Sequence, residues 1–426
     1  MIKIMKYGEV PPEKIFDRGE TSFDVSETVD EIIENVKTNG DKALLEYSKK
    51  FDKAELKSLE VTAEEIEEAF LTVEPRFIKI LKSAAENIKN FHKRQVRNSF
   101  IINEESGIVT GQKVTPIEKV GLYVPGGTAA YPSTVLMDSI PAKIAGCKEI
   151  CITTPPLPDG KVNPVILAAA KIAGVDRIFK VGGAGAIAAL AYGTETIPKV
   201  DKIVGPGNAF VAEAKRRVFG TVAIDMIAGP SEILVIADEK SNPKFVAADL
   251  LSQAEHDKMA SAVLVTDSID LAKAVQQEIE RQLNKLPRKE IAKASVDNKG
   301  KIIVAEDIAD VIAVSNKIAP EHLELCVDNP FDYLDKITNA GSIFMGRYCP
   351  EALGDYYAGP NHTLPTSGTA RFSSPLSVDD FVKKSQYTYY TKDALKRIAD
   401  DVAFFAEKEG LSAHARSATV RFEDEK

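Results

Sequence analysis

Glu321 and His322 place a carboxylate directly beside an imidazole, in a chain of 426 residues that contains only five histidines. Proton transfer near neutral pH relies on these two groups, because burial and neighbouring charges move both pKa values toward the working pH. The pair follows Pro320, a position that predicts the start of a helix. Two interpretations are therefore open: Glu321 caps this helix while His322 packs at its start, or the two form an acid–base pair.

A second group of residues has the character of metal ligands. Gln253 and His256 lie three residues apart in a predicted helix, so both side chains project from one face. An amide oxygen and an imidazole nitrogen suit a metal such as zinc, although a polar helix surface has the same pattern. Asp355 follows Gly354, which permits close backbone approach, and it either completes a site or lies in a solvated turn. His414, beyond a predicted helix end, has the pattern of a surface residue.

Three turns rich in glycine each follow a predicted strand. Two of them open helices, whose first backbone N–H groups attract phosphate. The second turn also fits part of a dinucleotide-binding fingerprint, but a helix packed closely on a sheet requires small residues as well. Three such turns in one layer favour a nucleotide. They are Gly126-Gly127, Gly182–Gly185 and Gly205–Asn208.

The composition is that of an ordinary globular protein, with 44% hydrophobic and 27% charged residues. A formal net charge of −9 argues against nucleic-acid or anionic-membrane partners. No apolar run is long enough to span a bilayer, and the first residues do not form a signal peptide. The four scattered cysteines predict no disulfide framework, so we expect a cytoplasmic location. Cys326 raises the alternative of a thiol nucleophile, but its apolar neighbours favour a buried, inert thiol.

The elements that must position these residues alternate between strands and helices. The first hundred residues are predicted to be helical, with a capping box at Thr62 and Glu65 and a helix start at Pro75. From Gly107 onward, short apolar strands alternate with helices, which predicts parallel sheets with crossover helices. A helical segment is expected over 379–410. The predicted strands are Val120–Val124, Glu149–Thr153, Arg177–Val181, Lys202–Val204, Glu232–Ala237, Ala262–Thr266, Lys301–Val304 and Ser342–Met345.

Taken together, these residues resemble the histidinol dehydrogenase family, and the resemblance spans nearly the whole chain. The motifs that carry it are KVGLYVPGGTAAYPSTVLM from Lys119, DKIVGPGNAFVAEAKRRVFG from Asp201, IDMIAGPSEILVIAD from Ile224, DLLSQAEHD from Asp249, APEHLEL from Ala319, ALGDYYAGPNHTLPTSGTARFSSPLSV from Ala352 and EGLSAHARS from Glu409.

The resemblance implies a zinc-requiring, NAD-dependent enzyme that oxidises L-histidinol to L-histidine through bound L-histidinal, at the end of histidine biosynthesis. It implies an α/β fold of two Rossmann-like layers with small helical N- and C-terminal extensions, in an intertwined homodimer with shared active sites. The expected domains are an N-terminal extension (1–21), a large α/β domain with the metal and catalytic residues (22–121 plus 231–376), an NAD-binding Rossmann-like domain (122–230) and a helical C-terminal tail that reaches the partner subunit (377–426).

The resemblance also assigns roles to individual residues. His322 would handle protons in the two hydride-transfer steps, and Glu321 would activate water between them. One zinc ion per subunit would bind Gln253, His256, Asp355 and His414. The NAD contacts would be Tyr123, Gly185 and Asn208. The substrate contacts would be Ser231, Gln253, His256, His322, Asp355, Glu409 and His414, with Glu409 and His414 supplied by the partner subunit.

Gly185 departs from the family pattern, which usually has Gln at this position, so one side-chain contact to NAD is lost. This departure leaves open a related NAD-linked dehydrogenase that acts on another amino alcohol. A non-catalytic, metal- and nucleotide-binding regulatory protein is the alternative of a different class, and it would not need Glu321 and His322. The loop over 359–374, in which the role of His362 is open, is expected to close over the site.

Overall fold

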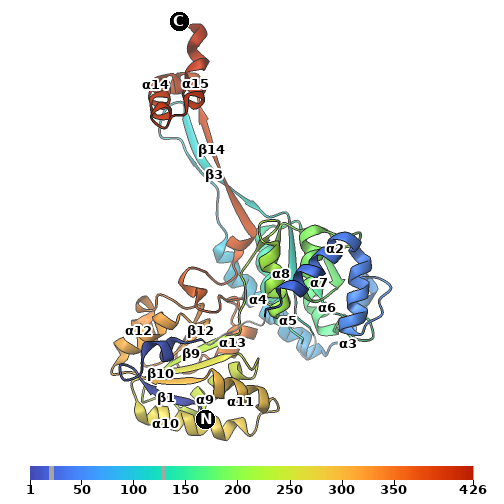
Figure 1. Cartoon of the computed structure of the whole chain (residues 1–426), viewed down its shortest axis with the longest axis vertical. Coiled ribbons are helices and arrows are strands. Elements are labelled where there is room, and N and C mark those ends of the chain that lie inside the picture. Colours follow the sequence, from blue (N-terminus) through green and yellow to red (C-terminus); the bar gives the residue numbers. More distant parts are fainter. Residues whose placement is uncertain (19–23, 127–129, 426) are drawn as a thin grey trace. The chain divides into compact units, whose positions relative to one another are not determined.

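The computed structural model describes residues 1–18, 24–126 and 130–425, which form two compact units. Unit 1 comprises Met1–Gln95 and Ile117–Phe381, and unit 2 comprises Val96–Pro116 and Val382–Lys426 (Figure 1). Gly127 of the first glycine turn and the expected boundary after residue 21 lie outside the described residues. The finer division into four domains stays a prediction. None of the described helices is both long and apolar enough to cross a membrane.

One α/β layer of unit 1 is built on a five-stranded parallel sheet with the order β6-β5-β4-β7-β8. Helices α2, α7 and α8 pack on one face of this sheet, and α3, α4, α5 and α6 pack on the other. The strands are β4 (Lys119–Tyr123), β5 (Glu149–Thr154), β6 (Arg177–Lys180), β7 (Lys202–Val204) and β8 (Ala223–Ile224). The helices are α2 (Ser26–Tyr47), α3 (Ala63–Thr72), α4 (Pro75–His92), α5 (Pro132–Ala145), α6 (Pro164–Ala173), α7 (Gly183–Tyr192) and α8 (Ala209–Val218).

The other layer of unit 1 is built on a six-stranded parallel sheet with the order β1-β11-β10-β9-β12-β13. Helices α9, α10 and α11 lie on one side of this sheet and α12 on the other, as Figure 1 shows. The strands are β1 (Lys3–Lys6), β9 (Glu232–Ala237), β10 (Ser261–Thr266), β11 (Lys301–Val304), β12 (His322–Cys326) and β13 (Ser342–Met345). The helices are α1 (Pro12–Phe16), α9 (Pro243–Ala254), α10 (Ile269–Leu283), α11 (Lys289–Asn298), α12 (Ile308–Ile318) and α13 (Glu351–Tyr356).

Both sheets share one topology. Apart from the edge strand β1, each places its strands in the chain order third, second, first, fourth, fifth. This order belongs to doubly wound α/β folds, whose strands are buried on both faces and therefore appear in the sequence as continuous apolar runs. The expectation of two Rossmann-like layers is confirmed, as are the capping box at Thr62 and the helix start at Pro75.

The expectation that Glu321 and His322 open a helix is wrong. Helix α12 ends at Ile318, and Ala319 follows it in the left-handed conformation with φ +52°. The chain then enters strand β12, where His322 pairs with Ile233 on one side and with Ser342 on the other. Tertiary burial explains the difference, because a strand between β9 and β13 buries the apolar residues that follow His322.

Three further elements differ from the sequence expectation. In the N-terminal segment, which the sequence predicts to be helical, Lys3–Lys6 forms the edge strand β1, because it pairs in parallel with β11. Helix α9 ends at Ala254, so His256 lies in the turn after the helix rather than on its face. In the tail, Val382–Tyr390 forms strand β14 instead of helix, and helix begins only at Lys392. The tyrosine and threonine residues of β14 favour a strand, and pairing with a neighbouring strand satisfies its backbone.

Unit 2 combines a three-stranded antiparallel sheet, with the order β14-β3-β2, and two helices. Strand β14 pairs with β3 along its length, from Val382 opposite Pro116 to Tyr390 opposite Ile108. The helices pack on each other through a small cluster of buried alanines. The elements are β2 (Phe100–Ile102), β3 (Ile108–Pro116), β14 (Val382–Tyr390), α14 (Lys392–Lys408) and α15 (Ser412–Thr419).

A buried ion pair fixes the third glycine turn. Lys215 and Asp225 are bonded to each other, with side chains only 2% and 1% exposed. Lys215 also donates to the Gly205 carbonyl at 2.9 Å, and the Gly205 amide donates to Asp225 at 2.8 Å. Gly205 has φ +115°, and a side chain there would collide with the Tyr123 carbonyl. The pair therefore holds the turn against the end of β4.

Lys215→Met should lower the free energy of unfolding by about 3–5 kcal/mol, because it leaves the carboxylate of Asp225 buried without its cation. Thermal and chemical denaturation followed by circular dichroism would measure this loss. Lys240→Met is the matched control, because Lys240 and Asp328 pair with side chains that are 64% and 50% exposed. Little change is expected in the control. Equal stability of the two variants would contradict the role of the buried pair.

Candidate active site

Glu321 and His322 lie at the amino-terminal edge of the six-stranded sheet. The side chains of both contact the backbone of a single residue of β9, Glu232. The amide of Glu232 donates to Glu321 Oε2 at 2.8 Å, and its carbonyl oxygen lies 3.0 Å from His322 Nδ1. A carbonyl oxygen only accepts, so this contact forms in the tautomer of the neutral ring whose Nδ1 carries the proton. The other nitrogen, Nε2, is therefore the one free to accept a proton.

The side chain of His322 faces a buried polar group from two helices. The Gln253 amide nitrogen, near the end of α9, lies 3.1 Å from His322 Nδ1 and donates to Glu351 Oε1 at 2.9 Å. On α13, Glu351 Oε1 lies 3.8 Å and Asp355 Oδ1 3.9 Å from His322 Nε2. Gly354 lets this helix approach closely, because a Cβ there would lie 2.4 Å from the ring of Phe344.

Burial is the largest influence on the titration of these groups. It lowers the pKa of His322 to about 4 and raises the pKa of Asp355 to about 6. It also raises the pKa values of Glu321 and Glu351 well above their usual range, with further repulsion from the charge of Asp355. A bound divalent cation would lower the pKa values of the three carboxylates again, because a nearby positive charge favours the carboxylate form. The site is thus electrostatically suited to a cation.

Side-chain donors from this group could hold a metal ion. Ligand atoms of His322, Glu351 and Asp355 lie within 4.8 Å of one another. Among the described residues, Gln253 Oε1, Glu351 Oε2 and His322 Nε2 are buried without a hydrogen-bond partner. Buried polar atoms without partners are costly, and a bound metal ion together with a bound substrate would satisfy them. Their nitrogen and oxygen chemistry fits zinc.

The structure brings some of the predicted metal and substrate residues together. Gln253 and Asp355 both lie beside His322, and Ser231 directly precedes β9 at the same sheet edge. His256 is exposed in the turn after α9, and its charge is felt by both His322 and His362. Glu409 and His414 belong to unit 2 and are exposed there.

Two residues of this site were not assigned from the sequence. Glu351 lies one turn before Asp355 on α13, so recognition of that short helix would have placed both carboxylates on one face. His362 is half-buried, with Nε2 3.2 Å from Thr134 Oγ1 and Nδ1 3.9 Å from Asp355 Oδ1. The loop after α13 carries His362 into the site, and no periodic pattern announces such a loop.

That loop is docked onto α5 of the five-stranded layer. Asn361 donates from its amide to the Met137 carbonyl at 2.6 Å, and Thr363 donates to Asp138 Oδ1 at 2.8 Å. Both loop side chains are buried. The first half of the predicted closing loop is therefore fixed in place. Exposed residues begin at Ser367.

The predicted nucleotide contacts lie at the carboxyl edge of the five-stranded sheet, whose strand order reverses between the paired strands β4 and β7. Ligands of doubly wound folds bind at this switch point. The Gly183 amide donates to the Tyr123 hydroxyl at 3.2 Å, and Asn208 caps α8 by accepting from the Phe210 amide at 3.1 Å. Gly185 is buried in α7, where a Cβ would lie 3.4 Å from Leu44 and 3.5 Å from Tyr47.

A thiol nucleophile finds no support at this site. Burial, together with the nearby charge of Glu324, strongly raises the pKa of the Cys326 thiol. The thiolate is the reactive form, so a raised pKa leaves the group inert. The chemistry of the site rests on its carboxylates and imidazoles.

Comparison with known proteins gives one consistent match. The histidinol dehydrogenase family model matches residues 17–422. The chain is 60% identical to a histidinol dehydrogenase of Clostridium acetobutylicum, over 99% of this chain and 99% of that protein. It is 56% identical to one of Listeria monocytogenes, over 95% of each. The crystal structure of histidinol dehydrogenase from Elizabethkingia anophelis matches with a TM-score of 0.94 and 43% identity, covering 99% of this chain and 98% of that one. This chain belongs to the histidinol dehydrogenase family.

Proposed function

We propose that this chain oxidises L-histidinol to L-histidine through bound L-histidinal, with NAD as electron acceptor and zinc as resident metal. The observation that carries the proposal is the buried pair Glu321–His322. The backbone of Glu232 contacts both side chains, and His322 faces the carboxylates of Glu351 and Asp355, which are possible metal ligands. Family membership supplies the substrate class. A regulatory binding protein would not need an oriented acid–base pair.

His322 is suited to take the proton of the substrate alcohol. Its Nδ1–H is committed to the Glu232 carbonyl, so Nε2 presents a lone pair toward Asp355 and Glu351. Burial keeps the ring neutral before the reaction, because it lowers the pKa of His322. A neutral, oriented imidazole is the form that a general base requires.

Glu321 is suited to activate water for attack on the aldehyde. Its Oε2 accepts from the Glu232 amide and lies 3.7 Å from His322 Nδ1, which leaves the other carboxylate oxygen for a water proton. Ionised Glu321 would take this proton as the water oxygen bonds to the aldehyde carbon. Ionised Glu321 would be favoured by a metal ion bound in the site, because a positive charge counteracts the rise in pKa that burial causes.

The proposed zinc ligands are Gln253, His256, Asp355 and the partner subunit's His414, and the NAD contacts are Tyr123, Gly185 and Asn208. When bound, zinc would polarise the alcohol oxygen and NAD would accept hydride. Glu351 is bonded to Gln253, so it orients the amide whose oxygen would face the metal. Substrate contacts are proposed for Ser231, Gln253, His256, His322, Asp355, Glu409 and His414.

A homodimer with shared sites is supported by the surface of unit 2. Phe404 and Phe405 on α14 are 61% and 68% exposed, whereas the buried cluster between α14 and α15 consists of three alanines. Unit 2 has a small core and a large exposed aromatic surface, so contact of that surface with another protein surface would stabilise it. We propose that a second copy covers it and thereby receives His414 and Glu409.

Purified protein should form NADH when histidinol is added, with an NADH-to-histidinol ratio of about two because each molecule loses four electrons. Dialysis against a chelator should abolish this activity, and added zinc should restore it. Absorbance at the NADH band and metal analysis of the protein would measure both effects. Other amino alcohols serve as control substrates. No NADH from histidinol in the zinc-loaded protein would refute the proposed function.

Glu321→Gln should slow the conversion of histidinal to histidine by about 10²–10⁴-fold, because the general base for water is lost. The conversion of histidinol to histidinal should fall much less. Stopped-flow NADH formation from each substrate would separate the two halves. Glu324→Gln is the matched control, because burial raises the pKa of Glu324 to about 9 and glutamine keeps its neutral charge. Equal losses in both halves for Glu321→Gln would contradict the assignment.

His256→Ala and His414→Ala should each inactivate the enzyme, since each removes one proposed zinc ligand. If the ligands come from different subunits, a mixed dimer contains one intact site and one doubly altered site. Refolding the two variants together in equal amounts should restore about a quarter of the wild-type activity. Each variant refolded alone is the control. A mixture as inactive as its components would argue that the site is not shared.

A further inference from the structure

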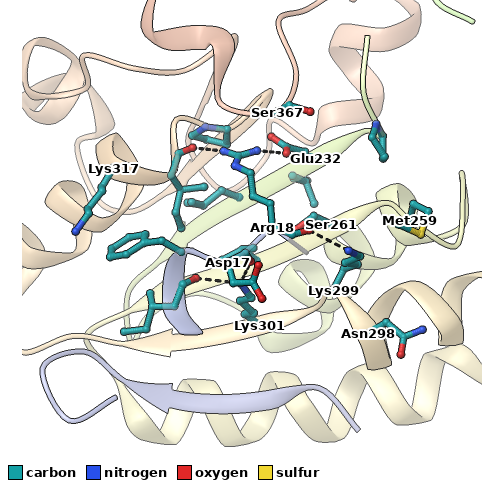
Figure 2. A pocket seen from close by; sticks show the side chains of 18 residues that line it. Asp17, Arg18, Glu232, Met259, Ser261, Asn298, Lys299, Lys301, Lys317 and Ser367 are labelled. Carbon is teal, nitrogen blue, oxygen red and sulfur yellow. Dashed lines mark hydrogen bonds and ion pairs between the residues drawn. The ribbon is translucent and has the colours of Figure 1, made fainter. Parts of the chain in front are cut away.

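Arg18 reaches the residue that holds the catalytic pair. Its guanidinium bonds the side chain of Glu232 through one nitrogen and the Ile318 carbonyl at the end of α12 through another (Figure 2). The Glu232 side chain is 12% exposed and that of Arg18 is 32% exposed. The pair is thus partly buried, where an arginine–carboxylate contact is stronger than on the surface.

Glu232 binds the catalytic pair through its backbone, and the charge of its carboxylate also raises the pKa of Glu321. The amide binds Glu321 and the carbonyl binds His322, while the side chain extends to Arg18. Rotation of this one residue would therefore disturb both catalytic groups at once. Glu232 Oε2 is buried without a hydrogen-bond partner among the described residues, so Arg18 is the cation that compensates the charge of this carboxylate.

We propose that Arg18 is a positioning residue that, by clamping the side chain of Glu232, keeps its peptide groups aligned with Glu321 and His322. This inference rests on the proposed function for its catalytic readout. Arg18 touches neither of the two catalytic side chains and acts only through Glu232. Its second contact, to Ile318, anchors the guanidinium to the end of the helix that leads into β12. The clamp thereby joins the starts of β9 and β12 from outside the sheet.

The neighbouring cations do not duplicate this role. Lys299 donates to the Arg18 carbonyl at 2.9 Å and Lys301 to the Ile15 carbonyl at 3.0 Å, so both ammonium groups hold the backbone of the N-terminal segment. Lys317 lies over the ring of Phe16 at 4.1 Å. Loss of Arg18 would leave Glu232 without a cation, since these three groups are otherwise engaged.

A cavity of about 190 Å³ adjoins Arg18 and makes the inference open to chemical rescue. The side chains of Arg18 and Glu232 both line it, as Figure 2 shows. In Arg18→Ala, the space of the missing side chain would join this cavity. A guanidinium ion then has a route to the carboxylate of Glu232 and the geometry to bond it in place of the lost group.

Arg18→Ala should lower kcat for histidinol oxidation by about 10- to 100-fold, the usual cost of losing a group that orients a reacting residue, with little change in the KM for NAD. Millimolar guanidinium chloride should recover part of this kcat, whereas sodium chloride at equal ionic strength should not. Arg18→Lys should retain more activity than Arg18→Ala. A kcat equal to that of the wild type, or a loss that guanidinium leaves unchanged, would overturn the proposal.

Lys317→Ala is the matched control, because the Lys317 side chain lines the same cavity and lies over the ring of Phe16 without contacting Glu232. Its kcat should stay near the wild-type value. Glu232→Ala should lower kcat as Arg18→Ala does, and the double variant should be no worse than either single one, since both remove the same clamp. Additive losses would show that Arg18 acts by another route.

Nuclear magnetic resonance provides a readout that does not depend on activity. With ¹⁵N-labelled histidine, the Nδ1–H of His322 should give a hydrogen-bonded proton signal, assigned by its loss in His322→Asn. This signal should shift or disappear in Arg18→Ala and persist in Lys317→Ala. An unchanged signal in Arg18→Ala would overturn the clamp even if the protein did not oxidise histidinol, so the two proposals fail separately.

Discussion

The pairing of strands β9 and β12 is the constraint on which the rest of the site depends. It sets His322 opposite Ile233, and the peptide groups of the preceding residue, Glu232, then face both Glu321 and His322. A shift of this register by one residue would turn His322 to the other face of the sheet. The apolar residues of both strands are buried on both faces and oppose such a shift, so core packing secures the geometry of the acid–base pair.

The six-stranded layer uses the edge of its sheet that is opposite to the one that doubly wound folds normally use. At its carboxyl edge, Arg347 bonds Asp238 and Asp328, each at 2.6 Å, and these ion pairs occupy the ends of β9 and β12. Its polar site lies at the amino edge instead. The five-stranded layer follows the usual rule, with its glycine turns at the carboxyl edge. The loop that carries His362 is bound to α5, so the two layers meet beside the site.

The buried carboxylates carry an electrostatic cost when they are ionised, and a bound cation would relieve it. Glu321, Glu351 and Asp355 all have raised pKa values because they are buried away from water, and the charge of Asp355 adds to the rise for Glu321 and Glu351. Such a loss of folding stability is common at functional sites, because a ligand that binds there stabilises the folded state. Unit 2 has a comparable incompleteness, because its aromatic residues on α14 are exposed.

The sequence by itself determined the alternation of strands and helices, because buried parallel strands are continuous apolar runs and helix starts carry local signals such as the capping box at Thr62. It also singled out Glu321, His322, Gln253 and Asp355 by residue type. Tertiary structure decided that His322 begins a strand, since only β9 and β13 offer it partners. It also brought Glu351 and His362 into the site, because a six-residue helix and a docked loop depend on contacts far away in the chain. Local patterns encode what neighbouring residues do together, whereas burial and long-range pairing exist only once the chain is folded.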